Sequence, residues 1–190
     1  ILYRLVGSEM CIRDSLRVVP ATIHIPIKDI TKCLNAELIE KTIKTTHQEL
    51  TNRFSISNPS IWISGLNPHA GEAGTIGDEE QKFIEPVIRK LRSEGYNLKG
   101  PMSADTMFYR KKRREFDAAV CMYHDQALIP IKTLDFHSSV NLTIGLSFIR
   151  TSPDHGTAFD IAGKNLANPT STIEAIKLAW HLSKKEKKNQ

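Results

Sequence analysis

The sequence predicts an α/β fold, with a parallel or mixed sheet and flanking helices, from three observations. Short apolar runs rich in β-branched residues alternate with segments of helical periodicity, the pattern of strands joined by crossover helices. Polar or glycine-rich turns follow the strands. The 190 residues are 40% hydrophobic and 25% charged, which is an ordinary globular composition with enough length for one sizeable domain. No repeat or low-complexity linker divides residues 16–182, so we expect one continuous unit there.

The two ends of the chain are expected to stand apart from that unit. Residues 1–15 lack a clear period, and they do not form a signal peptide, because their apolar stretch is short and interrupted by Arg4 and Glu9. We interpret them as a spurious or foreign segment, set aside from the fold, with the N-terminal part of the fold missing upstream of Leu16. Residues 183–190 are mostly charged and are expected to form a solvated tail.

The first strand and helix are expected before residue 51. Residues 17–27 read as a strand that Pro20 interrupts and that carries His24 near its end. Asn35 is suited to cap a helix that continues to about Leu50. The inward face of this helix is expected to carry Leu38, Ile39, Ile43 and Leu50.

A second strand and helix follow. Residues 60–64 form a short apolar strand that runs directly into the turn bearing His69. Residues 78–91 form a strongly amphipathic helix, in which Pro86 should cause a kink or mark a break and after which Gly95 is a stop signal. The apolar stripe of this helix consists of Phe83, Ile84, Val87, Ile88 and Leu91.

The last elements are three β-like runs and a helix. Residues 118–123 are the clearest strand, and 140–146 and 148–151 are β-like. The sequence STIE at 171–174 is a capping box that predicts a final helix through about Leu182.

Composition and charge exclude several functional classes. The net charge is +5, but much of it lies in the run at 111–114 and in the C-terminal tail, without interleaved aromatic residues for base stacking. We therefore expect no nucleic-acid partner. No run of eighteen apolar residues exists, so no membrane span is expected. Cys11, Cys33 and Cys121 form no CxxC pair, which argues against a disulfide framework and favours the reducing cytoplasm.

Three histidines are candidate metal ligands and catalytic residues. His24, His69 and His124 each accompany an apolar strand, and ligands in open α/β sheets bind at the carboxyl ends of strands. Three protein ligands with an open position are typical of a catalytic metal site, and imidazole suits zinc, cobalt, nickel or iron. The alternative is a structural or exposed histidine, which is the interpretation we keep for His47 and His181.

Two further features surround these histidines. The glycine-rich loop at 67–77 leads into a helix, so its backbone N–H groups could approach an anion, although a tight turn would need the same glycines. The loop matches neither GxGxxG nor the Walker pattern. Asp125 and Gln126 could orient His124 or simply cap a helix.

A second set of candidate residues suits an anionic substrate. Lys132 and Arg150 are cations beside apolar segments, so they either extend to water or hold an anion. Arg150 can bind phosphate or carboxylate in bidentate fashion. Asn141 completes the set, and Asp154 with His155 forms either a polarised pair or an Asx turn.

Five blocks, in order along the chain, carry a resemblance to a known family. They are NPHAGE at 67–72, PMSADT at 101–106, MYHDQ at 122–126, VNLTIG at 140–145 and IRTSPDHGTA at 149–158. Together they resemble the 4-hydroxythreonine-4-phosphate dehydrogenases, the NAD-dependent oxidative decarboxylases of pyridoxal phosphate synthesis. Residues 16–182 then correspond to the C-terminal portion of the dehydrogenase.

The resemblance implies roles for the candidate residues. The divalent-metal ligands fall on His24, His69 and His124, and the substrate contacts fall on Lys132, Asn141 and Arg150. The family places its metal (zinc, magnesium or cobalt) at a homodimer interface, with histidines from both subunits. Its fold is similar to that of the isocitrate and isopropylmalate dehydrogenases, which bind NAD without the Rossmann glycine pattern. No residue of this chain is assigned to NAD.

The implied reaction oxidises and decarboxylates 4-phosphohydroxy-L-threonine to 3-amino-2-oxopropyl phosphate. Three alternatives stay open: a non-catalytic fragment that still dimerises and binds metal, a relative acting on another phosphorylated four-carbon acid, and a metal-dependent hydrolase. The hydrolase has only Asp125 or Asp154 as a general base.

The sequence departs from the family pattern at several points. Family members are far longer, and their N-terminal half supplies a substrate-contacting His-Thr pair that this chain lacks. Ala73 and Ala127 stand where glycine is usual, and Thr75-Ile76 replaces a frequent His-Met.

Overall fold

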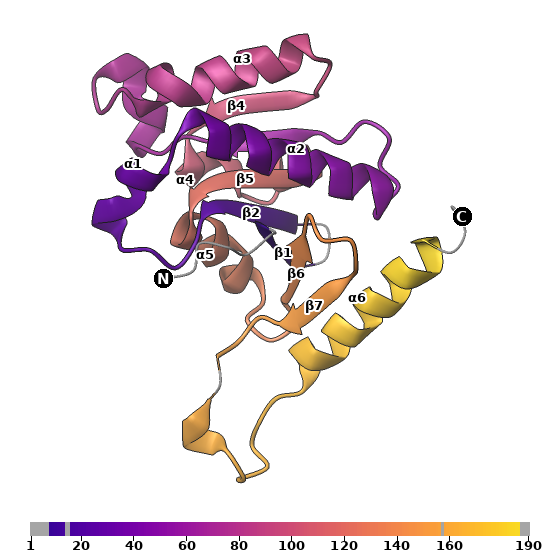
Figure 1. The fold of residues 1–190 in the computed structure, drawn as a ribbon. Coiled ribbons are helices and arrows are strands. Elements are labelled where there is room, and N and C mark those ends of the chain that lie inside the picture. The colour runs from indigo at the N-terminus through magenta and orange to yellow at the C-terminus, as the bar shows by residue number, and fades with distance from the viewer. Residues whose placement is uncertain (1–7, 14–15, 157, 187–190) are drawn as a thin grey trace.

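The protein is represented by a computed structural model that describes residues 8–13, 16–156 and 158–186. Its strands are β1 (Ser8–Arg13), β2 (Leu16–Thr22), β3 (Ile61–Ser64), β4 (Leu98–Met102), β5 (Ala118–Tyr123), β6 (Val140–Ile144) and β7 (Arg150–Pro153). They form one sheet in the order β4-β3-β5-β2-β1-β6-β7 (Figure 1).

The sheet has a parallel half and an antiparallel half. Strands β4, β3, β5 and β2 run parallel to one another. Strands β1, β6 and β7 pair in antiparallel fashion, and β1 joins the two halves. The four parallel strands therefore end at the same edge of the sheet. The predicted α/β class with a mixed sheet is confirmed.

Helices cover both faces of the sheet. They are α1 (Ile30–Cys33), α2 (Ala36–Asn52), α3 (Glu85–Ser93), α4 (Ala104–Met107), α5 (His124–Leu134) and α6 (Thr170–Glu186). Short 3-10 turns are η1 (Ile27–Asp29), η2 (Pro68–Gly74), η4 (Lys112–Arg114) and η5 (Phe159–Ile161), and η3 (Glu80–Ile84) is a π turn. Helices α2 and α3 lie on one face, α5 lies on the other, and α6 packs beside β7 (Figure 1). None of the helices in the described part is long and apolar enough to cross a membrane.

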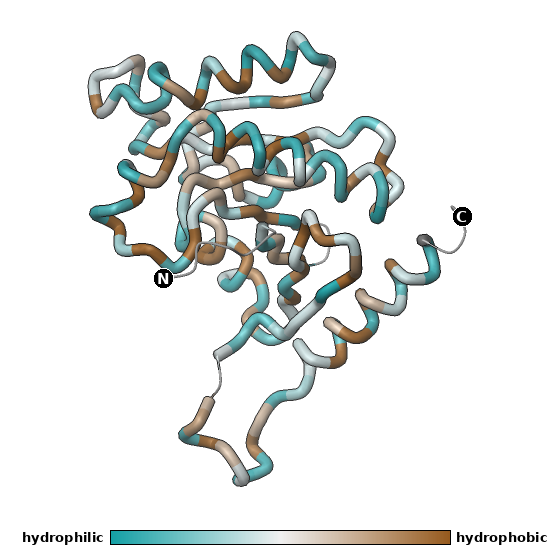
Figure 2. Tube along the Cα trace, in the orientation of Figure 1, coloured by the Kyte–Doolittle hydropathy of each residue, from teal (hydrophilic) through white to brown (hydrophobic). Residues whose placement is uncertain are grey.

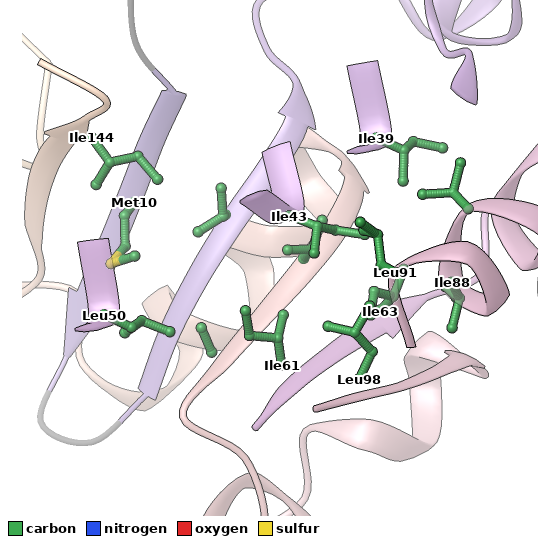
Figure 3. Packing of buried hydrophobic residues seen from close by; sticks show 14 of the residues in the cluster. Met10, Ile39, Ile43, Leu50, Ile61, Ile63, Ile88, Leu91, Leu98 and Ile144 are labelled. Atoms are coloured by element: carbon green, nitrogen blue, oxygen red, sulfur yellow. The ribbon is translucent and has the colours of Figure 1, made fainter. Parts of the chain in front are cut away.

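Alternation along the strands divides the core into two clusters. Ile61 and Ile63 on β3 face α2 and α3, where they meet Ile43 and Leu91 (Figure 3). Trp62, between them, faces the opposite side and belongs to the cluster under α5. Because successive side chains of a strand point to opposite faces, an uninterrupted apolar run is what a strand covered on both sides requires.

The expected cap of α2 is confirmed, because the side chain of Asn35 accepts a hydrogen bond from Leu38 N at 2.9 Å. Pro86 does not break the helical run: the backbone passes directly from the π turn η3 into α3, and Pro86 lies in the first turn of α3. Its fixed φ and missing N–H are tolerated in the first turn of a helix. Figure 2 shows hydrophobic and hydrophilic residues alternating along α3.

The predicted capping box at 171–174 is wrong. Helix α6 begins at Thr170, so Ser171 lies inside it, and Asn168 Oδ1 instead accepts from Thr170 N at 3.0 Å. The Ser171 hydroxyl donates to Ser139 O and accepts from Asp154 N. The Ser171 hydroxyl therefore bonds to residues distant in the sequence, although the local pattern predicted that it would cap the helix. Helix α6 also continues past Leu182, and residues 187–190 of the expected tail lie outside the described residues.

Residues 8–13 of the segment set aside by the sequence analysis lie inside the sheet. Strand β1 pairs with β2 and β6 and buries Met10 and Cys11, which are 0% and 1% exposed. The structure differs here from the expectation, because the backbone of this strand hydrogen-bonds to both neighbours. Residues 1–7 and 14–15 lie outside the described residues, and the foreign origin of the segment stays a prediction.

A buried ion pair ties α2 to the turn between β6 and β7. Arg53 Nη1 lies 3.0 Å from Glu49 Oε2, and both side chains are less than one-tenth exposed. Glu49 Oε1 accepts from Gly145 N at 3.0 Å, and Arg53 Nη2 donates to Leu146 O at 2.8 Å. The pair thus joins the end of a helix to the antiparallel half of the sheet.

Candidate active site

The three candidate histidines follow three adjacent parallel strands. His24 comes just after β2, His69 lies in η2 after β3, and His124 opens α5 directly after β5. The expected strand at 17–27 is shorter than predicted: β2 ends at Thr22, and His24 adopts a left-handed conformation with φ of 49°. The sequence placed His24 near the end of a strand, and the structure places all three histidines just beyond the carboxyl ends of strands.

The structure brings two of these histidines together. The ring centroids of His24 and His124 are 5.4 Å apart, with an interplanar angle of 43°. The ends of their strands are tied where Thr22 Oγ1 donates to Met122 O at 2.8 Å. His124 Nδ1 lies 2.7 Å from Asp125 Oδ1, and a carboxylate at one ring nitrogen leaves Nε2 for a ligand. This contact fits the predicted orienting role of Asp125.

A cavity of about 120 Å³ lies beside the two rings. Its walls combine apolar and polar groups: Thr22, Ile23, His24, Ile25, Ile27, Ile30, Tyr123, His124 and Asp125. A hollow with apolar walls and a few convergent polar groups is the usual form of a small-molecule site. The isoleucines of the segment after β2 were not singled out from the sequence, although their spacing within 23–30 is a usable signal.

His69 is not part of the pair. Within residues 8–13, 16–156 and 158–186, no group of three or more His, Cys, Asp or Glu side chains is arranged to hold a metal ion. His69 lies in an exposed loop whose residues 69–73 all have positive φ, between 43° and 76°. A single chain therefore offers two of the three expected nitrogen ligands at one place.

Gln126 joins the strand ends that carry His69 and His124. Its Oε1 accepts from Ser64 Oγ and from Met122 N, both at 2.7 Å, and its Nε2 donates to Gly65 O at 2.8 Å. The side chain is buried. It does not touch the His124 ring in any of these bonds, so its contribution is to align β3 and β5.

The residues expected to bind substrate lie on the α5 side of the sheet. Leu142 belongs to the cluster under α2, so its neighbours Asn141 and Thr143 point to the α5 side. Arg150 pairs with Thr143 across β6 and β7 and donates to its hydroxyl at 2.7 Å. Lys132 extends from α5 itself. The three candidates therefore share one face.

Asp154 links this set to the histidine pair. Lys132 Nζ donates to the Asp154 carbonyl at 3.1 Å and lies 3.6 Å from its Oδ1. Burial raises the pKa of the Asp154 carboxyl, Glu9 acts in the same direction, and Lys132 and His124 oppose them. The sequence left open a polarised Asp154–His155 pair or an Asx turn. In the structure the Asp154 carboxylate lies beside Lys132, whereas His155 Nδ1 lies 2.9 Å from Gly156 O.

Glu80 is a site residue that the sequence analysis did not single out. Its carboxylate is 1% exposed and lies under the loop that carries His69. The available signal was its position: Glu80 precedes Ile84 by four residues and Val87 by seven, so a charge stands in the apolar stripe.

Comparisons with known proteins identify a family and relatives that this chain resembles. A family model described as "Pyridoxal phosphate biosynthetic protein PdxA" matches residues 5–179. A 4-hydroxythreonine-4-phosphate dehydrogenase of Roseobacter denitrificans is 60% identical over 174 residues, covering 92% of this chain and 53% of the relative. One of Bradyrhizobium diazoefficiens is 57% identical over 168 residues, covering 88% and 49%. The chain spans about half the length of the curated relatives it matches.

Solved structures show the same relationship. A 4-hydroxythreonine-4-phosphate dehydrogenase of Klebsiella pneumoniae has a TM-score of 0.85 at 40% identity, covering 93% of this chain and 53% of that one. A terephthalate 1,2-cis-dihydrodioldehydrogenase of Burkholderia xenovorans has a TM-score of 0.74 at 37% identity, covering 90% and 54%. Enzymes named for different substrates therefore share this fold.

The five blocks that carry the resemblance all fall within the matched residues 5–179. The blocks at 67–72 and 122–126 contain His69 and His124, which lie at the carboxyl edge of the parallel strands. Since the match covers most of the chain, the chain belongs to the family of the pyridoxal phosphate biosynthetic protein PdxA.

Proposed function

We propose that this chain carries the metal- and substrate-binding portion of an NAD-dependent 4-hydroxythreonine-4-phosphate dehydrogenase. The reaction oxidises and decarboxylates 4-phosphohydroxy-L-threonine to 3-amino-2-oxopropyl phosphate in pyridoxal phosphate biosynthesis. The observation that carries the proposal is the His24–His124 pair beside a cavity at the carboxyl edge, in a chain of this family.

The chemistry of the donors suits a divalent metal. His24 and His124 would hold it with two imidazole nitrogens, and Asp125 would keep the His124 ring in place from its other nitrogen. His69 is the third ligand, and its separation from the pair in one chain supports a homodimer in which a second copy supplies it. When bound, the metal (zinc, magnesium or cobalt) supplies a Lewis acid for the substrate hydroxyl, and NAD supplies the hydride acceptor.

The residues on the α5 side of the sheet would bind the anionic substrate. Arg150 presents a guanidinium for phosphate or carboxylate, and Asn141 adds an amide on the same face. Lys132 is held near this face by its hydrogen bond to the Asp154 carbonyl, which restricts a long side chain before substrate arrives. Restricting these groups in advance lowers the entropy that binding would otherwise cost.

The cavity beside the histidines would hold the reacting part of the substrate between apolar and polar walls. Ile23, Ile25 and Ile27 supply apolar walls, whereas His24 and His124 supply the polar end. The scattered, free cysteines agree with a reducing cytoplasm as the place of action.

A second candidate differs only in the acid oxidised. The terephthalate dihydrodiol enzyme, which shares the fold at a TM-score of 0.74, is named for a substrate with no phosphate. The fold therefore occurs in enzymes named for different substrates, and the alternative is a relative acting on another phosphorylated four-carbon acid, such as threonate or erythronate phosphate. The other alternative is a non-catalytic piece that dimerises and binds metal, which the half-length coverage of the relatives motivates.

The test is an NADH-formation assay on the 190-residue protein. 4-Phosphohydroxy-L-threonine and the phosphates of threonate and erythronate are compared, with and without added zinc, magnesium or cobalt. We expect metal-dependent NADH with the first substrate, loss of turnover in His124→Ala, and a raised KM in Arg150→Met. NADH from another acid alone supports the second candidate. Metal binding without NADH from any acid, while a full-length relative is active in the same assay, supports the non-catalytic alternative.

A further inference from the structure

Glu80 is a buried carboxylate directly beneath the loop that bears His69. Its side chain belongs to the π turn η3 and is 1% exposed. A buried carboxylate is costly unless its oxygens accept hydrogen bonds. Its hydrogen-bond donors all come from the start of the loop, at Leu66 and Asn67.

Both oxygens of Glu80 are used. Oε1 accepts from Leu66 N at 2.7 Å and from Asn67 N at 2.8 Å. Oε2 accepts from Asn67 Nδ2 at 2.9 Å, and the same nitrogen donates to Glu79 Oε2 at 2.7 Å. Two carboxylates therefore take both hydrogens of the Asn67 amide and set its orientation. A neutral side chain of the same shape could not accept at both positions.

The loop that follows needs such an anchor. His69, Ala70, Glu72 and Ala73 are not glycines, yet each has a positive φ between 43° and 56°. The left-handed conformation costs about 1–2 kcal/mol for each such residue, so a run of them persists only when the surroundings over-determine it. Within the loop, backbone bonds close the turn from Ala70 N to Asn67 O at 3.1 Å and from Ile76 N to Gly71 O at 3.1 Å.

Glu80 also touches the middle of the turn. A Cβ on Gly71 would lie 2.6 Å from Glu80 Oε2, and a Cβ on Gly65 would lie 3.0 Å from Oε1. The carboxylate therefore packs against the backbone before His69 and again after it. A single buried side chain spans both sides of the exposed histidine.

We propose that Glu80 is the positioning residue of His69, which it holds by fixing the left-handed turn at 69–73 from below. The proposal rests on the proposed function, in which His69 is a metal ligand. Glu80 is not a catalytic residue, because its carboxylate is covered and bonded to the loop backbone.

The substitution that isolates this role is Glu80→Gln. The amide keeps the size of the side chain and one acceptor, but its NH2 group would face Asn67 Nδ2, so two donors would oppose each other. Turning the Asn67 amide over does not relieve the conflict, because its oxygen would then face the Glu79 carboxylate. The loop should lose its anchor, whereas β3 and α3 keep their apolar packing through Ile63 and Leu91.

The matched control is Glu85→Gln. Glu85 opens α3, its side chain is 38% exposed, and its ion pair with Arg89 spans 3.6 Å at the surface. The substitution makes the same change of charge one helical turn away, without touching the loop. Glu80→Asp is a second variant, which keeps both carboxylate oxygens but shortens the side chain by one methylene, so that they lie farther from the loop.

Two readouts are made on the 190-residue chain. Hydrogen exchange of peptides from 65–77 and from 118–123 measures whether the loop alone loosens. Titration with Co²⁺, followed by its visible absorption, measures the binding of metal. In Glu80→Gln we expect exchange at Leu66 and Asn67 to rise on the order of tenfold, with little change in β5. Co²⁺ affinity should fall about 10- to 100-fold, the range for loss of a residue that orients a ligand.

The outcomes separate the two proposals. Unchanged exchange at 65–77 in Glu80→Gln, or an equal rise in β5, overturns the positioning role. Faster loop exchange with Co²⁺ affinity unchanged in Glu80→Gln, while His69→Ala weakens binding, also overturns it. If His69→Ala leaves Co²⁺ affinity unchanged, the ligand role of His69 fails instead. Partial recovery of affinity in Glu80→Asp, with Glu85→Gln at the wild-type value, supports the role.

Discussion

The imidazole rings of His24 and His124 lie 5.4 Å apart at the carboxyl edge of the sheet, where β2 and β5 run side by side. The two strands are held in register close to the rings, because Thr22 Oγ1 donates to Met122 O at 2.8 Å. The backbone beside each ring is thus placed by strand pairing and by this hydrogen bond. The structure therefore places two imidazole rings side by side, as the proposed metal site requires.

Replacing His124 by alanine should weaken metal binding strongly. A direct ligand is removed, so the loss in Co²⁺ or Zn²⁺ affinity should exceed the roughly 10- to 100-fold that loss of an outer-shell partner costs. Calorimetric titration of the 190-residue chain measures it. His181→Ala is the control, because His181 is an exposed histidine on α6. Equal affinities for the wild type and His124→Ala would remove His124 from the ligand set.

Replacing Ala73 by glycine should stabilise the protein. Ala73 is exposed and has a φ of 56°, where a Cβ costs about 1–2 kcal/mol. Glycine removes that strain but loses roughly 0.4–1 kcal/mol through the freer unfolded chain, so a net gain of about 1 kcal/mol or less is expected. Urea unfolding measures it. The same change at Ala36, in the right-handed helix α2, should lower the free energy of unfolding. A loss at both positions would contradict the left-handed geometry at Ala73.

Replacing Glu49 by glutamine should destabilise the fold. Glu49 and Arg53 form an ion pair with side chains only 9% and 7% exposed, so the substitution removes the carboxylate charge from a buried pair. Breaking such a pair from one side costs roughly 3–5 kcal/mol. Chemical denaturation followed by tryptophan fluorescence checks the value. Asp78→Asn, which breaks the exposed pair with Lys82, should cost less than about 1 kcal/mol. Similar losses in the two variants would show that the Glu49 pair is not buried in solution.

Asp135 should contribute fully to stability above its ordinary pKa and lose that contribution as the pH falls toward the pKa of the folded state. Hydrogen bonds from the Ser138 hydroxyl and the His137 N–H, together with Arg13, lower the pKa of the carboxyl from 3.8 to about 2. The folded pKa lies below the unfolded one, so the contribution is present above about pH 4 and is lost as the pH falls toward 2. Asp135→Asn should flatten the fall in Tm across that window. Asp160→Asn, in the exposed turn η5, serves as the control. A parallel fall in the wild type and Asp135→Asn would refute the assignment.

Local patterns in the sequence predicted most of the parallel half of the fold. The run at 118–123 coincides with β5, because an apolar, β-branched segment covered on both faces has few other stable conformations. Asn35 caps α2 as expected, since the cap is formed within four residues of chain. Signals of this kind succeed when the partners of each group are neighbours in the sequence.

The same local rules fail where a distant partner competes. The hydroxyl of Ser171 bonds to Ser139 and to Asp154 rather than capping α6. Pro86 stands after a π turn, and a charge at Glu80 lies in the apolar stripe because the loop above supplies its donors. Spacing does not identify these partners, because those of Ser171 come from elsewhere in the fold and those of Glu80 depend on how η2 and η3 meet in space.

The sequence by itself determined the family, an α/β class with a parallel or mixed sheet, and the place of each histidine at or near the end of a strand. Only the tertiary structure decided that His24 and His124 meet while His69 does not join them, and that Lys132 is held at Asp154. The physical reason is that periodicity and caps act over a few residues. The order β3-β5-β2 and the pairing of β6 with β7 arise from burial of side chains that are far apart in the chain.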